Sequence, residues 1–93
     1  FPSIERDIAL IVSVNTSSLL ISKAIQKAGK PYLEDVELID KFTGAQIEEG
    51  KCSLAYRIRY RDDKRTLTDK EIQPIHEKVR EALKSSFDID LRS

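Results

Sequence analysis

The sequence predicts an α+β, ferredoxin-like βαββαβ sandwich: a four-stranded antiparallel sheet with two helices on one face and the other face open. Two observations lead to this prediction. Four short segments of alternating or β-branched apolar residues are interrupted by two helical patterns, in the order β-α-β-β-α-β. The second and third extended segments are joined by a short turn-forming stretch, which is typical of a hairpin. The length of 93 residues indicates one domain over residues 1–93, and because the sequence contains no methionine we expect this domain to be excised from a larger chain.

The first strand and the first helix are predicted from residues 8–29. The stretch Ile8–Val14 is short and β-branched, and its even positions are uniformly apolar, so we expect one buried face. Several N-cap candidates follow at residues 15–18. Gly29 stands where a left-handed C-cap is expected, and Pro31 prevents the helix from continuing. The apolar stripe of this helix comprises Ile21, Ala24, Ile25 and Ala28.

The predicted hairpin joins a strand at Leu33–Phe42 to a strand at Lys51–Arg61. Gly44 and the stretch Glu48–Gly50 supply the turn residues between them. The later strand alternates most cleanly in the chain, so one of its faces belongs to the core. Its apolar positions are Cys52, Leu54, Tyr56, Ile58 and Tyr60, and its basic positions are Lys51, Arg57, Arg59 and Arg61.

The second helix is predicted to begin with a capping box at Thr68–Glu71, with a hydrophobic staple between Leu67 and Ile72. Pro74 lies deep in this pattern, so we expect a kink there or a helix that restarts at Pro74. The apolar stripe comprises Ile72, Ile75, Val79, Ala82 and Leu83. A fourth strand is expected at Phe87–Leu91, where apolar and charged residues alternate.

These elements predict one core between the helices and the two central strands, the first and the third. We expect it to contain Ile8, Leu10, Ile21, Ile25, Leu54, Tyr56, Ile58, Val79 and Leu83.

Composition excludes several classes of protein. The 16 basic and 16 acidic residues balance, so any attraction to nucleic acid must come from a local surface. Cys52 is the single cysteine, which excludes an internal disulfide and a multi-cysteine zinc site and favours a reducing, cytoplasmic location. The longest apolar stretch, residues 8–12, is too short to span a bilayer, so no membrane association is expected.

A basic stripe on the open face of the third strand is the first candidate site. Residues 51–65 hold six basic and two acidic side chains, whereas residues 33–49 hold six acidic and one basic. A basic stripe on an open sheet suits the phosphates of a nucleic acid. The alternative is a solvated face whose arginines pair with carboxylates across the hairpin. The stripe consists of Lys51, Arg57, Arg59 and Arg61, with Lys64 and Arg65 just beyond it, and the candidate carboxylates are Glu34, Asp35 and Glu37.

Small residues lie in the middle of the same face. Ala9, Ser53 and Ala55 occupy the two central strands and leave room for a flat ligand such as a base. The alternative is that a neighbouring domain or helix covers them.

No group of residues predicts catalysis. His76 is the single histidine and lies beside the apolar stripe of the second helix, which is more typical of a helix flank than of an acid–base role. Cys52 falls on the core face, where a thiol behaves as a small apolar group. We expect no catalytic residue, metal site or cofactor site in this domain.

Five motifs in register resemble the ferredoxin-fold anticodon-binding domain found at the C-terminus of the phenylalanyl-tRNA synthetase β subunit. They are FPSIERDIAL at residues 1–10, DKFTG at 40–44, GKCSLAYR at 50–57, RTLTDKE at 65–71 and LR at 91–92. Together they cover essentially the whole chain. The resemblance does not distinguish a bacterial β subunit from a single-chain organellar enzyme.

The resemblance implies a binding module of an ATP- and magnesium-dependent phenylalanine–tRNA ligase. The bacterial enzyme is an (αβ)₂ heterotetramer whose active site lies in the α subunit. By this resemblance we expect the domain to bind the anticodon stem-loop of the phenylalanine tRNA and to perform no reaction. Family contacts map to Ala9, Asp40, Phe42 and Ser53, and Phe42 replaces the usual tyrosine. Simple alternation places Asp40 and Phe42 on the core side, so their contact with RNA requires a twist or bulge near Gly44.

Two other functions are compatible with the same fold. A generic RNA-recognition motif is one, although the aromatic-rich signature expected on the third strand is replaced by Ser53, Ala55 and arginines. A small-ligand or protein-interaction domain is the other, and a rise in melting temperature with ligand in the absence of RNA would favour it.

Overall fold

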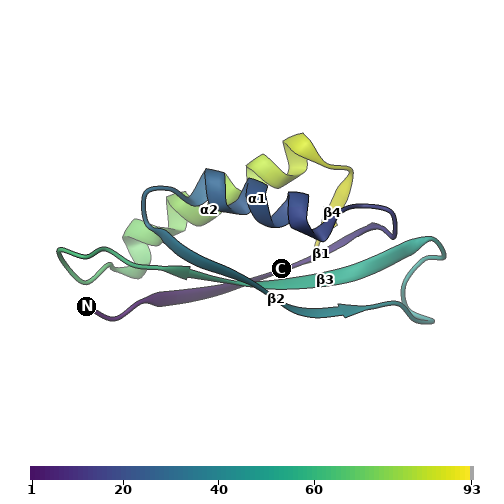
Figure 1. Cartoon of the computed structure of the whole chain (residues 1–93), viewed down its shortest axis with the longest axis horizontal. Helices are drawn as coiled ribbons and strands as arrows, with labels where there is room; N and C mark the ends of the chain where they lie inside the picture. The colour runs from purple at the N-terminus through teal and green to yellow at the C-terminus, as the bar shows by residue number, and fades with distance from the viewer. Residues whose placement is uncertain (93) are drawn as a thin grey trace.

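The computed structural model describes residues 1–92, and these residues form a two-layer sandwich (Figure 1). Both helices cover one face of a four-stranded antiparallel sheet with the strand order β2-β3-β1-β4, and the other face is open. The elements are β1 (Ile4–Ser13), α1 (Ser18–Gly29), β2 (Leu33–Phe42), β3 (Lys51–Tyr60), α2 (Asp69–Ser86) and β4 (Ile89–Leu91). The predicted ferredoxin-like α+β fold is confirmed.

Alternation along the two central strands produces the core. β1 and β3 pair in a continuous antiparallel register, for example Leu10 with Leu54, and every second residue turns towards the helices. Ile21 and Ile25 of α1 and Val79 of α2 are fully buried against that face. All the core residues predicted from the sequence are buried, and Cys52 is buried with them at 3% exposure.

The boundaries of β1 and β4 differ from the prediction. β1 starts at Ile4, because Ile4 already pairs with Tyr60, and it stops at Ser13. Val14, predicted to continue the buried face, lies beyond the strand and is 47% exposed. Phe87, predicted to open β4, caps α2 instead, since its backbone N–H donates to the carbonyl of Leu83.

The predicted left-handed C-cap at Gly29 of α1 is wrong. Ser17 caps the start of the helix by accepting a hydrogen bond from the backbone of Leu20. Gly29 belongs to the helix and does not adopt the predicted left-handed conformation, which Gly50 alone adopts among the described residues, with φ +82°. A Cβ at position 29 would lie 2.4 Å from Cδ1 of Leu33, so glycine is required by the close approach of β2.

The start of α2 agrees with the sequence-based prediction. Thr68 and Glu71 form the predicted capping box, and Leu67 and Ile72 on either side of it are both buried. The helix is continuous across Pro74, so the predicted alternative of a restart at that residue is wrong. None of the helices within residues 1–92 has both the length and the apolar character needed to cross a bilayer.

Candidate nucleic-acid interface

The open face of the sheet places the candidate site residues in two adjacent rows. Residues directly opposite each other on paired strands lie on the same face of the sheet. The first row is Asp40–Ala55–Ala9 and the second is Phe42–Ser53–Ile11, each read from β2 through β3 to β1. We call the three small residues in the middle, Ala9, Ser53 and Ala55, the floor. All three are half-buried and lie on the central strands.

A β-bulge in β2 brings Asp40 and Phe42 to this face. Leu38 pairs with Tyr56 on the core side, but the next paired residue is Asp40, opposite Ala55. The extra residue, Ile39, shifts the alternation by one position, so the core-side placement predicted from simple alternation is wrong. The bulge that contact with RNA requires is present, four to six residues before Gly44.

The rim of the floor carries different chemistry on its two sides. At the β2 edge, Asp40 is exposed and Phe42 is 47% exposed, although it is a large aromatic ring. On β1, Ile11 lies at the end of the second row but is only 8% exposed, so this side of the floor is apolar and offers little accessible surface. A flat floor beside an exposed ring and a carboxylate suits a planar ring that carries N–H donors.

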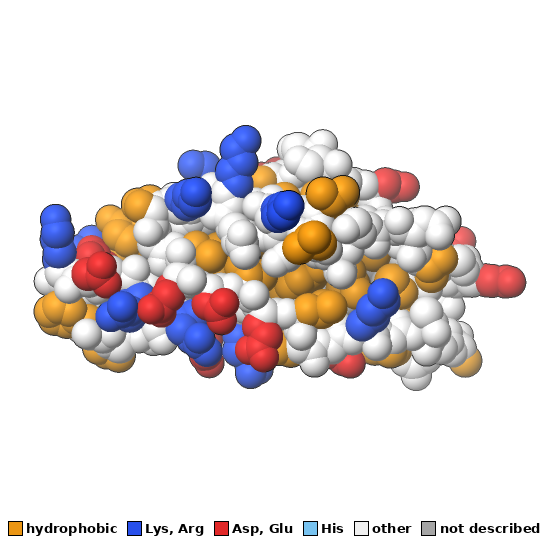
Figure 2. Space-filling model, viewed as in Figure 1, with side chains coloured by type: hydrophobic (Ala, Val, Ile, Leu, Met, Phe, Trp, Pro, Cys, Tyr) orange, Lys and Arg blue, Asp and Glu red, His pale blue; other side chains and the backbone are white. Residues whose placement is uncertain are grey.

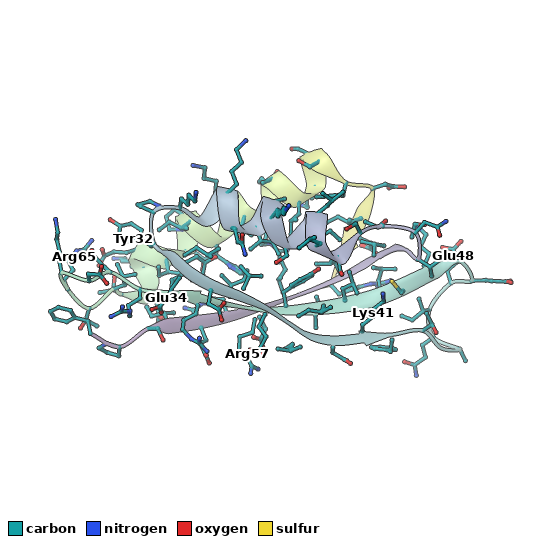
Figure 3. All side chains as sticks on the ribbon, in the orientation of Figure 1. Tyr32, Glu34, Lys41, Glu48, Arg57 and Arg65 are labelled. Atoms are coloured by element: carbon teal, nitrogen blue, oxygen red, sulfur yellow. The ribbon has the colours of Figure 1, made fainter. Side chains whose placement is uncertain are left out.

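The arginines of the predicted basic stripe are all paired with carboxylates. Figure 3 shows Arg57 pointing away from the helices, and its guanidinium donates to both oxygens of Asp7, at 3.0 and 3.2 Å. These hydrogen bonds raise the pKa of Arg57, and Glu37 lies opposite it on β2.

The next two arginines repeat the arrangement. Arg59 binds Glu5 at 2.9 Å and Asp35 at 3.4 Å. Arg61 binds Glu34 at 3.0 Å and Asp63 at 3.2 Å. We call these three arginines and their carboxylate neighbours the arginine ladder. Figure 2 shows acidic and basic side chains lying next to one another at the lower left of the view.

The ladder carries more negative than positive charge. Its carboxylates are Glu5, Asp7, Glu34, Asp35, Glu37 and Asp63, which outnumber its guanidinium groups by three. The predicted pairing with Glu34 and Asp35 is therefore confirmed, whereas the partners on β1, Glu5 and Asp7, were missed. A phosphate approaching this end of the face meets carboxylates that already occupy the guanidinium groups.

Lys51 differs from these arginines. It lies on the open face opposite Ser13, next to the row of Ser53, and makes no ion pair within residues 1–92. Its ammonium group is therefore free to bind a phosphate. Of the four basic residues predicted for this surface, Lys51 is the one without a carboxylate partner.

His76 lies at the edge of the core, and Cys52 lies inside it. Nδ1 of His76 lies 3.1 Å from the hydroxyl of Tyr60 at the edge of the core. Burial lowers the pKa of His76, which favours the neutral ring. Residues 1–92 contain no group of three or more histidine, cysteine or acidic side chains arranged to hold a metal.

Two hollows of the surface lie away from the floor. One, of about 370 Å³, is lined by Tyr32, Glu34 and residues 61–64, and part of its lining is labelled in Figure 3. Another of similar volume lies between α1 and α2, beside Lys27 and Lys78. Neither hollow is lined by a floor residue, and the candidate interface lies on the open face of the sheet, where bases can spread.

Comparison with known proteins identifies the family of this domain. Residues 1–92 match the model of the ferredoxin-fold anticodon binding domain. The chain is 54% identical over 92 residues to a phenylalanine–tRNA ligase β subunit of Prochlorococcus marinus, covering 99% of this chain and 11% of that protein. It is 50% identical to the corresponding subunit of Trichormus variabilis, covering all of this chain and 12% of that subunit.

A more distant relative matches over the same extent. The β subunit of Geobacillus kaustophilus is 46% identical over 92 residues, again 99% of this chain and 11% of the relative. The chain thus spans about one ninth of the length of these proteins. On the match across residues 1–92, the chain belongs to the ferredoxin-fold anticodon binding domain family.

Proposed function

We propose that this chain is the anticodon-reading part of a phenylalanine–tRNA ligase β subunit, and that it binds the anticodon stem-loop on its open sheet face. The observation that carries the proposal is the pair of rows that join Asp40 and Phe42 to the floor of Ala9, Ser53 and Ala55. Family membership supplies the ligand class, and the rows supply a surface of suitable shape.

The mechanism is binding without reaction. An unstacked base lies on the floor, because alanine and serine side chains leave the sheet accessible there. The ring of Phe42 stacks on a base, and base–aromatic stacking contributes about 1–3 kcal/mol. The carboxylate of Asp40 accepts hydrogen bonds from base N–H groups, and the hydroxyl of Ser53 donates or accepts one. Phe42 stacks as a tyrosine would but offers no hydroxyl.

Phosphate contacts set the register of the RNA without reading its sequence. Lys51 is available for this role. Arg57, Arg59 and Arg61 bind phosphate only if a carboxylate of the arginine ladder is exchanged for it, so we assign them first to the stability of the sheet.

The remaining parts of the reaction belong to the parent protein. We propose that it is a cytoplasmic, ATP- and magnesium-dependent ligase, in which this β subunit pairs with an α subunit in an (αβ)₂ assembly. Anticodon contacts here help to place the acceptor end of the tRNA at the distant active site. We expect no phenylalanine-dependent ATP–pyrophosphate exchange from the 93 residues alone.

The test is a titration with the anticodon stem-loop of phenylalanine tRNA and with a loop whose anticodon is exchanged. We expect the chain to prefer the cognate loop, and the variants Asp40→Asn, Phe42→Ala and Ser53→Ala to lose the preference. Asp88→Asn makes the same chemical change at an exposed position before β4 and is the matched control. Equal binding of both loops by the unmodified chain would reject the proposal.

A further inference from the structure

Arg92 extends the first row of the interface at the β4 side. Its backbone N–H donates to the carbonyl of Ala9 at 2.7 Å, which continues the pairing of Leu10 with Leu91 by one residue. Opposed residues share a face, so Arg92 lies on the open face beside Ala9.

The complete first row is therefore Asp40–Ala55–Ala9–Arg92, with a carboxylate at one end and a guanidinium at the other. Neighbouring strands are about 4.8 Å apart, so the two ends are separated by roughly 14 Å of backbone spacing. A base that reaches Asp40 lies on the alanines, and Arg92 faces a different part of the same RNA.

The pairing of Arg92 differs from that of the arginine ladder. Among the described residues its carboxylate partner is Asp90, at 3.1 Å, and the two side chains are 61% and 63% exposed. Such an exposed pair contributes at most about 1 kcal/mol. A phosphate can replace Asp90 and bind the guanidinium through two parallel hydrogen bonds. Each arginine of the ladder, by contrast, lies between two carboxylates.

We propose that Arg92 is a phosphate-binding residue of this interface, and that the RNA backbone crosses the sheet along β1 and β4 rather than over the arginine ladder. Asp90 holds the guanidinium in the absence of RNA and is displaced on binding. Lys51 lies on β3, opposite Ser13 of β1 and beyond the second row, and is a second basic group at that end of the floor. The inference rests on the proposed function, since that function supplies the RNA.

The test is a titration of the chain with the cognate stem-loop at several salt concentrations. Arg92→Gln should weaken binding about tenfold and reduce the slope of log K against log[salt] by about 0.7, the loss of one single-strand phosphate contact. The cognate preference should remain, because base contacts are unchanged. Arg80→Gln, which changes the charge equally on the helical side, is the matched control and should leave both values unchanged.

Two further variants test whether the arginine ladder contributes to RNA binding and whether Asp90 competes with phosphate for Arg92. The double variant Asp7→Asn with Arg57→Gln removes a neutral pair of the ladder and should change binding less than twofold. Asp90→Asn should strengthen binding severalfold, and only when Arg92 is present. An Arg92→Gln variant that retains its melting temperature and binds the cognate loop as the unmodified chain does would overturn the inference. A chain that does not distinguish the two loops would instead reject the proposed function.

Discussion

Deletion of a single residue tests whether the bulge in β2 builds the interface. Between Leu38 and Phe42, β2 advances four positions, while its partner advances three, from Tyr56 to Ser53. Deleting Ile39 makes the two counts equal. The strand then loses its bulge, but Asp40 and Phe42 stay opposite Ala55 and Ser53. We expect this variant to bind the cognate stem-loop within about threefold of the unmodified chain, since stacking and base contacts are preserved.

Deleting Lys41 also shortens β2 by one residue, but we expect this variant to lose affinity for the stem-loop, because one of the two contact residues leaves the open face. If the bulge persists, Phe42 moves to the helix side of the sheet. If the bulge is lost, Asp40 does. Loss of Phe42 stacking, about 1–3 kcal/mol, corresponds to about a 5- to 150-fold loss of affinity.

The assay is a stem-loop titration at low ionic strength, accompanied by thermal melting of both variants. Amide and ring contacts measured by NMR between position 42 and Ser53 report the register independently of RNA. The reasoning is refuted if both deletions melt alike and lose binding equally, or if deletion of Lys41 has no effect on binding.

Three further predictions concern stability, each measured by denaturant unfolding. Leu54→Ala should cost about 2–5 kcal/mol, because Leu54 is 1% exposed in the centre of the core; a cost below about 1 kcal/mol would contradict the packing. Gly29→Ala should destabilise by about 1–3 kcal/mol despite the better helix propensity of alanine, because the new Cβ meets Leu33 at 2.4 Å. With Leu33→Ala in the same chain the combined loss should be smaller than the sum of the two, and strict additivity would refute the contact. Burial lowers the pKa of His76 from 6.5, so the unfolded chain takes up the proton at higher pH, and the free energy of unfolding should fall as the pH drops below about 6.5. In the His76→Gln variant the free energy of unfolding should fall less over this pH range. If the variant and the unmodified chain lose the same free energy of unfolding, the role of His76 is rejected.

Much of the fold was predictable because its signals are local. The alternation of β3 identified its core face, and Thr68 and Glu71 marked the start of α2 through contacts within one helical turn. The motifs of residues 1–10 and 50–57 indicated the family for the same reason, since they are read along the chain without knowledge of its pairing.

The geometry of the interface depended on contacts between distant segments. Asp7 binds Arg57 across 50 positions of sequence, and only the β1–β3 register brings them together. The bulge at Ile39 reverses the faces of Asp40 and Phe42, yet no turn residue marks it, because a one-residue register shift is decided by the partner strand. Gly29 was mistaken for a cap because its actual constraint is the approach of Leu33 from the next strand. Local patterns along the chain thus determined the elements, the core, the family and the open face of β3, whereas cross-strand register, which exists only in the folded chain, decided that Asp40 and Phe42 join that face and that Glu5 and Asp7 meet the arginines.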